Sequence, residues 1–225
     1  MKLEVNRWAK GATLATIMIV VFYVLVAYLV LGLADYCHEW AHSLAAVALG
    51  VKSNVLDIRY SYRPFFIGID ENVDYGLVAR LPGWQGVLIA FAGLLVNVLF
   101  ASVALLLTIR YPNSRVVRSR LSFFLFFWLA WWDSTEWFNY MVIRNIFPHG
   151  DVANMIRFGF PHAILLVVGI LTSVGFLYLI FGPARRRFNE KFGLSSLAQR
   201  WFLCFLIILF VMDQSTKVMF FMFSA

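Results

Sequence analysis

The residues best suited to chemistry are two histidines and a glutamate close together in an apolar stretch. His38, Glu39 and His42 form the pattern H-E-x-x-H. Four residues make just over one turn of an α-helix, so both imidazoles project from one face and can bind one metal ion, with the glutamate beside them. The alternative is a pair of core histidines satisfied by hydrogen bonds. Because ionisable side chains in an apolar helix are costly and normally face a site or cavity, the metal-binding interpretation is favoured.

A third metal ligand must come from elsewhere in the chain, because a catalytic zinc usually takes three protein ligands and leaves one position for water. Asp151 is the leading candidate, since it follows a helix-breaking segment at residues 145–150. Non-helical backbone at membrane depth is tolerated only where it is buried in protein or lines a wet cavity. His149 is the alternative ligand, although a supporting or interfacial position suits it better. Asp133 and Glu136 lie within an apolar run and rank below Asp151 as ligands.

The composition indicates a polytopic membrane protein. Of the 225 residues, 62% are apolar and only 14% are charged, whereas soluble domains average about 45–50% apolar and about 25% charged residues. A chain of this kind has too little polar surface to cover itself in water, which excludes a soluble enzyme and a disordered chain. Cys37 and Cys204 lie in or beside apolar stretches and imply no disulfide framework.

Apolar runs of membrane-spanning length predict about five to six transmembrane helices, since a helix needs about 20 residues to cross the hydrocarbon core. The first run continues through the histidine motif to residue 51. It is therefore either one long tilted helix, which gives five crossings, or two helices divided by a kink near Gly32, which gives six. The runs cover residues 11–34, 81–109, 121–146, 158–184 and 201–223.

Basic residues in three short segments predict how the chain is oriented. Residues 1–10, 110–120 and 185–191 each carry a net positive charge, as cytoplasmic loops do. Five crossings place all three segments on one side, so the charge pattern favours five and predicts that these segments are cytoplasmic loops. A nucleic-acid-binding protein would need one contiguous basic face with interleaved aromatic residues, which the sequence lacks.

Residues 53–80 differ from the apolar runs and predict a small β-sheet at the membrane surface. Polar and apolar residues alternate over 57–63, as in a half-buried strand. Phe65–Ile69 and Tyr75–Leu81 are predicted to be further short strands on either side of a turn at residues 71–74. An edge strand at this position would be able to pair with an extended peptide.

Three segments follow one another in an order that is more specific than the metal motif alone. The first is the His38–His42 motif on a membrane helix. The second is Ala92–Asn97, which is similar to an Ala-Gly-Pro-x-x-Asn helix, and the third is residues 139–151, which are similar to an Asn-x-x-Pro…Asp-Gly segment. Over residues 30–155 the chain resembles the site-2 proteases, a family of intramembrane zinc metalloproteases. The departures are Leu94 in place of the proline, a shorter spacing between Pro148 and Asp151, and Val152 in place of the glycine.

The resemblance implies one zinc ion held by His38, His42 and Asp151, with Glu39 as the general base. It also implies that Asn97 contacts the substrate near the metal. Zinc lowers the pKa of bound water towards about 7 and polarises a carbonyl group, and a carboxylate can move a proton from that water to the leaving amine. Asn97 has an alternative role in a hydrogen bond between helices.

Polar residues elsewhere in the apolar runs are interpreted mainly as packing groups. For Asn139 and Asn145, a hydrogen bond between helices is the favoured role. Asp213 and Lys217 lie four residues apart in the last run, so they are predicted to pair on one helix face.

The predicted function is zinc-dependent hydrolysis of peptide bonds in membrane-spanning or membrane-proximal substrates. The expected partners are a membrane protein or peptide substrate, the lipid bilayer and other subunits of a membrane complex, with no nucleic acid. One alternative is a non-catalytic protease-like subunit that scaffolds a larger complex. Another is a transporter that uses Asp133, Glu136 and Asp213 as a polar pathway.

The predicted architecture is therefore an all-α polytopic membrane protein with a small surface β-sheet. Residues 1–225 are expected to form a single membrane-embedded domain. Its metalloprotease-like core is predicted to cover residues 11–155 and to include the sheet region at 53–80. Residues 158–225 are predicted to add further transmembrane helices.

Overall fold

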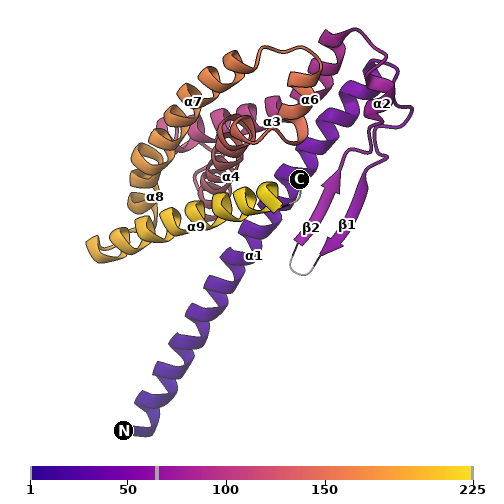
Figure 1. Ribbon diagram of the computed structural model, residues 1–225. Helices are drawn as coiled ribbons and strands as arrows, with labels where there is room; N and C mark the ends of the chain where they lie inside the picture. The colour runs from indigo at the N-terminus through magenta and orange to yellow at the C-terminus, as the bar shows by residue number, and fades with distance from the viewer. Residues whose placement is uncertain (1, 64–65, 224–225) are drawn as a thin grey trace.

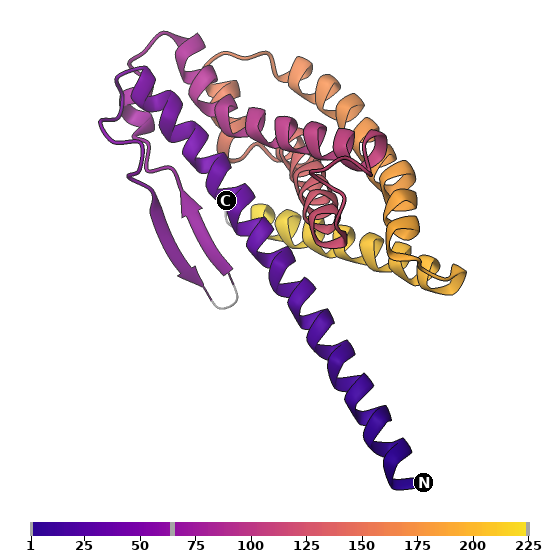
Figure 2. The same cartoon turned by 180° about the vertical axis from the view of Figure 1, so that it is seen from behind.

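The first helix is one continuous element. The computed structural model describes residues 2–63 and 66–223, and it is mostly helical with one small sheet (Figure 1). Helix α1 (Lys2–Ala48) has 47 residues, so at 1.5 Å per residue it is about 70 Å long. Its N-terminal half extends away from the other helices (Figures 1 and 2). The kink near Gly32 and the six-crossing alternative are therefore wrong, and residues 2–10, predicted as a loop, belong to α1.

In the described part of the chain, four helices are long and apolar enough to span a membrane. The predicted count of five to six is therefore not confirmed. Helix α4 (Arg120–Phe138) is not among the four, because Asp133, Glu136 and several tryptophans lower its hydropathy. More than half of its residues are buried, and a helix enclosed by protein does not need an apolar, lipid-facing surface. The four spans are Ala15–Ala48, Gly83–Arg110, His162–Phe192 and Ser196–Met219.

The second half of the chain is a series of helices, two of which are π-helices. The elements after α3 (Gly83–Arg110) and α4 are η1 (Asn139–Ile143), α5 (Arg144–Ile146), α6 (Gly150–Arg157), α7 (His162–Leu179), η2 (Ile180–Ala184), α8 (Arg185–Phe192) and α9 (Ser196–Phe223). The prediction of a loop at 185–191 is wrong, because the helix continues past Pro183 through the wider turn of η2. Lys191 Nζ donates to the Pro112 carbonyl at 3.2 Å, so two of the basic segments lie side by side.

A two-stranded antiparallel hairpin lies beside the C-terminal half of α1 (Figures 1 and 2). It consists of β1 (Arg59–Arg63) and β2 (Phe66–Asp70). Tyr60 is the register partner of Ile69. The predicted sheet is therefore present, with two strands in the described residues, and its position brings one of them next to the histidine-bearing part of α1.

The predicted third strand is wrong. Residues 75–78 form a short helix, α2 (Tyr75–Val78), because the Asp74 side chain caps it and accepts hydrogen bonds from the backbone N–H groups of Gly76 and Leu77 at 2.8 and 3.2 Å. The turn expected at residues 71–74 consequently joins a strand to a helix. The start of the predicted strand Phe65–Ile69 lies outside the described residues, and its remainder corresponds to β2.

Three hydrophobic clusters of described residues hold the helices together. The largest one surrounds α4 and includes stacked rings within α4 and a tilted ring pair between α4 and α8. The second one lies where α3, α4, α6, α7 and η1 meet, and it contains Trp137, Tyr140 and Met155. A third, small one joins α1, α2 and α3. Because side chains in such clusters are closely packed, the second cluster fixes α6 and η1 relative to α3. These are the elements that carry the polar residues described next.

Candidate metal centre

The two motif histidines face the same point. His38 and His42 lie in the C-terminal half of α1 and are 4% and 0% exposed. Their ring centroids are 4.8 Å apart, and their Nε2 atoms are 3.1 Å apart. This is the arrangement expected of imidazoles one helical turn apart.

Asp151 brings a carboxylate to the same point from a distant part of the chain. Its Oδ2 atom lies 3.2 Å from His38 Nε2 and 3.3 Å from His42 Nε2. Asp151 is in the first turn of α6, directly after Gly150, which has a φ of +56°. A Cβ atom on Gly150 would lie 2.6 Å from Arg144 Nη1. The glycine therefore allows the tight turn, and the short spacing from Pro148 does not keep Asp151 from the histidines.

The three donor atoms have the spacing of a tetrahedral metal site. Zinc binds histidine nitrogens and carboxylate oxygens at about 2.0–2.2 Å, so the edges of such a tetrahedron are about 3.3–3.6 Å long. The observed separations of 3.1, 3.2 and 3.3 Å are close to these edges. Among the described residues, His38, His42 and Asp151 form the group able to hold a metal ion. The prediction that these three residues come together is confirmed.

The opposite nitrogen of each imidazole is held by helix α3. His42 Nδ1 lies 2.7 Å from the Ile89 carbonyl oxygen, and His38 Nδ1 lies 3.1 Å from Asn97 Oδ1. Because both oxygens accept, both Nδ1 atoms donate, so each imidazole in its neutral form presents a lone pair at Nε2. Metal-binding histidines characteristically have such support, which fixes the tautomer and the ring orientation.

A third residue on the same face of α3 lets the imidazoles approach. Gly93 lies four residues from both Ile89 and Asn97, so all three share one face of the helix. A Cβ atom on Gly93 would lie 2.3 Å from His42 Nε2 and 2.6 Å from His38 Nε2. The backbone of Gly93 therefore forms one wall of the site. Any side chain at this position would occupy the space next to the two Nε2 atoms.

The electrostatics of the site keep Asp151 ionised. Burial by itself would raise the pKa of this carboxyl, but positive charge on a protonated His42 and hydrogen bonds from His38 and His42 outweigh burial and hold the pKa below its usual range. A metal cation bound between the same atoms would lower this pKa as well. Asp151 is therefore a carboxylate, which is the form that binds metal ions.

Glu39 faces two cavities that meet at the site. A cavity of about 220 Å³ is lined by His38, Glu39 and Asn97. A larger one of about 860 Å³ is lined by Glu39, Asp151 and β2 residue Ile69, with α9 on another side. Glu39 does not belong to the donor group, and it borders both cavities beside that group.

The lower-ranked ligand candidates do not belong to the donor group. His149 is exposed and precedes α6, and burial of part of its ring, together with Arg144, lowers its pKa. Asp133 and Glu136 are buried in α4, and neither belongs to the donor group. Glu136 instead forms an ion pair with Lys217 of α9.

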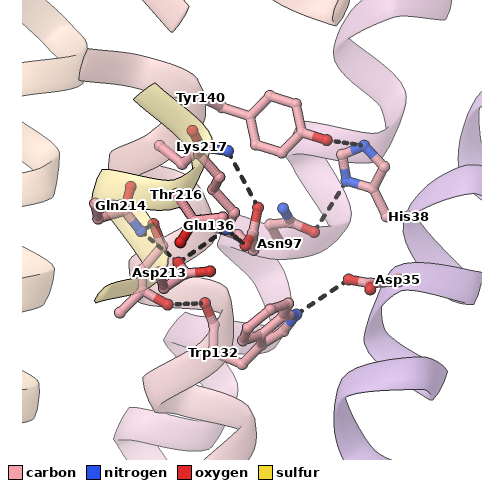
Figure 3. Close-up of polar contacts among 12 residues, drawn as sticks. Asp35, His38, Asn97, Trp132, Glu136, Tyr140, Asp213, Gln214, Thr216 and Lys217 are labelled. Carbon is pink, nitrogen blue, oxygen red and sulfur yellow. Dashed lines mark hydrogen bonds and ion pairs between the residues drawn. The ribbon is translucent and has the colours of Figure 1, made fainter. Parts of the chain in front are cut away.

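A second set of charged residues lines the smaller cavity, and Figure 3 shows their polar contacts. Lys217 pairs with Glu136 and, at 2.9 Å, with Asp213, which confirms the predicted pair on the last helix. Trp132 Nε1 donates to Asp35 Oδ1 at 3.1 Å. Ionisable groups in membrane proteins are expected to pair inside the bundle in this way, and these contacts attach α9 and α4 to the region of the site.

The asparagines predicted from the sequence have distinct roles. Asn97 positions His38 (Figure 3), which is the alternative role of a hydrogen bond between helices, while its contact with a substrate stays a prediction. Asn139 donates to Glu136 Oε2 at 3.4 Å. Asn145 Nδ2 donates to the Met141 carbonyl at 3.0 Å. The side chains of Asn139 and Asn145 therefore bond within the α4–η1–α5 segment rather than between separate helices.

Tyr140 and the structural role of Gly93 were not predicted from the sequence. Tyr140 Oη lies 3.3 Å from His38 Nε2, and Figure 3 shows the hydroxyl directed at the imidazole. Tyr140 is one of many aromatic residues in its run, so residue type does not single it out. Gly93 lies inside a recognised segment, but its contact with the histidines depends on how α3 packs against α1.

Comparisons of the chain with protein-family models, curated proteins and solved structures found no match.

Replacing Gly93 with alanine is expected to weaken metal binding at least tenfold, because the methyl group would occupy the space next to both Nε2 atoms. Zinc affinity is measured by competition with a chromophoric chelator, on protein whose helix content is checked by circular dichroism. Gly32→Ala in α1, where the added methyl group meets nothing within 4 Å, is the matched control and should bind as the wild type does. Wild-type affinity in Gly93→Ala would contradict the geometry.

Proposed function

We propose that the chain is an intramembrane zinc endopeptidase. The observation that carries the proposal is the convergence of His38, His42 and Asp151 at one point on a candidate membrane helix, with Glu39 at the open side. The likeness of three sequence segments to the site-2 proteases supports the same activity. In this proposal the protein is a multi-pass membrane protein with residues 1–10, 110–120 and 185–191 in the cytoplasm.

Zinc is favoured over other metals by the residue that accompanies the ligands. Two histidines and one carboxylate also suit ferrous iron in oxygenases. A glutamate between two histidines on one helix is instead the pattern of zinc hydrolases, in which the glutamate is the base. Glu39 lies in this position and lines both cavities. Hydrolysis gives Glu39 a role as the base, whereas oxygen chemistry gives it none.

The proposed reaction consumes one water molecule per peptide bond. When bound, zinc supplies a lowered pKa for water and polarises the scissile carbonyl. Glu39 takes one proton from the water at a carboxylate oxygen, and the water oxygen bonds to the carbonyl carbon. Glu39 then delivers that proton to the amide nitrogen as the C–N bond breaks. The products are a carboxylic acid and an amine, and Glu39 returns to its starting state.

The larger cavity suggests how a substrate would reach the site. Its walls include Glu39 and Asp151 on one side, β2 residues Ile69 and Asp70 on another, and α9 residues such as Met212. A membrane-spanning helix has its carbonyl groups bonded internally, so it must unwind before hydrolysis. We propose that the unwound strand pairs with the edge of β2, which adds backbone hydrogen bonds in an extended conformation.

Replacing Glu39 with glutamine is expected to abolish cleavage and to preserve zinc content. General-base catalysis contributes about 10² to 10⁴ in rate, and Glu39 is not among the three donors. The purified protein is reconstituted with a panel of single-span reporter proteins, and new chain ends are identified by mass spectrometry. Glu190→Gln, at an exposed residue of α8, is the control and should cleave normally.

Equal cleavage by wild type and Glu39→Gln would contradict the mechanism. A wild type that binds zinc but cleaves no reporter in the panel would instead favour the non-catalytic subunit that scaffolds a membrane complex.

Replacing Ile69 with proline is expected to reduce cleavage at least tenfold without changing zinc content, because proline removes a backbone donor from β2. Tyr60→Pro is the matched control: Tyr60 is the register partner of Ile69 on β1, so both prolines lie at the same level of the hairpin. Ile69 lines both cavities, whereas Tyr60 lines neither. Equal loss of cleavage in the two variants would show that the hairpin matters only for folding and would remove the edge-pairing proposal.

A further inference from the structure

Tyr140 is a polar residue next to the metal-binding group, and the reaction described above gives it no role. It is 8% exposed, and its ring stacks on His38 with centroids 5.1 Å apart and an interplanar angle of 26°. Its hydroxyl lies 3.3 Å from His38 Nε2. That nitrogen is one of the three converging donor atoms. Its distance to the hydroxyl is about the distance between two ligand atoms in a tetrahedral zinc site.

The backbone around Tyr140 is specialised. Tyr140 lies in the π-helix η1, and π-helical turns within α-helices are frequent at functional sites. Asn145 Nδ2 donates to the carbonyl groups of Tyr140 and Met141 at 3.4 and 3.0 Å. These bonds satisfy carbonyl oxygens at the irregular turn, so the position of Tyr140 is fixed by more than its own side chain.

Arg144 packs on the Tyr140 ring and lines the same two cavities as Tyr140. Its guanidinium carbon lies 3.8 Å from the Tyr140 ring centroid, a cation–π distance. Glu39, Tyr140 and Arg144 all line both the smaller and the larger cavity. The phenol, the base and the guanidinium therefore border the volume in which a substrate would be bound.

We propose that Tyr140 is a catalytic residue whose hydroxyl donates a hydrogen bond to the scissile carbonyl oxygen as negative charge develops on it. This inference rests on the proposed function and deepens it. When His38 Nε2 binds a metal, its lone pair no longer accepts a hydrogen bond, so the Tyr140 hydroxyl is released to a new acceptor. A phenol with an ordinary pKa of about 10 carries its proton at neutral pH and can donate it to a hydrogen bond.

A fixed donor in a site that excludes water is effective because it needs no reorganisation during the reaction. The donor must also lie on the side of the metal site where the substrate carbonyl would bind. Tyr140 and Glu39 line both cavities, whereas Asn97 lines the smaller one and its Oδ1 accepts from the opposite edge of the His38 ring. Because the Tyr140 hydroxyl also lies 3.3 Å from His38 Nε2, it is positioned to meet the substrate oxygen.

The test uses the full-length protein loaded with Co²⁺ and titrated with acetohydroxamate, a small metal-binding anion that places a charged oxygen at the metal. Tyr140→Phe removes only the hydroxyl and keeps the ring. The variant is expected to bind Co²⁺ with wild-type affinity and visible spectrum, and to bind acetohydroxamate about tenfold to 100-fold more weakly, the range of a hydrogen bond to a charged group. Cleavage should fall by about 10² to 10³, as on removal of one oxyanion donor.

Tyr178→Phe, at an exposed tyrosine of α7, is the control and should match the wild type in all measurements. Unchanged acetohydroxamate binding in Tyr140→Phe would overturn the inference. A loss of Co²⁺ affinity would also overturn it, since Tyr140 would then be a ligand. A wild type that binds Co²⁺ and acetohydroxamate but cleaves nothing would refute the protease function while leaving the hydrogen bond to be judged by the titration. A wild type that binds no Co²⁺ would refute both.

Discussion

Three lone pairs that converge in the protein interior are the constraint on which the rest of the structure depends. His38 Nε2, His42 Nε2 and Asp151 Oδ2 lie within 3.3 Å of one another, and hydrogen bonds on the opposite nitrogens direct both imidazole lone pairs inward. Acceptors that face one another in a buried site are costly unless a proton or a metal cation lies between them. A divalent metal ion meets this requirement and would supply the chemistry of the proposed hydrolysis.

The surrounding helices are arranged to maintain this convergence. One face of α3 supplies an acceptor for His42 at Ile89, an acceptor for His38 at Asn97 and, between them, the open space at Gly93. The turn at Gly150 places Asp151 at the start of α6. Helices α3 and α6 are separate elements of the chain. The hydrophobic cluster that packs α3 against α6 and η1 is therefore needed to hold Asp151 next to the two histidines.

The local chemistry of the site could be predicted from the sequence, whereas its packing could not. The pattern at His38 and His42 needs only the helical period, and Asp151 stands out because it follows a break in an apolar run. The role of Gly93 depends on the register between α1 and α3, which no local pattern encodes. The third strand was wrongly predicted because the Asp74 cap, a local side-chain effect, outweighs the β propensity of the following residues.

X-ray absorption at the zinc edge, on the purified protein, tests whether His38, His42 and Asp151 bind one metal ion. We expect one zinc ion per chain with two imidazole nitrogens and an oxygen at about 2.0–2.2 Å. Asp151→Ala should lose this signal, and Asp57→Ala, at an exposed aspartate of the surface region, should retain it. A wild type without bound metal, or a zinc spectrum unchanged in Asp151→Ala, would contradict the proposed metal site.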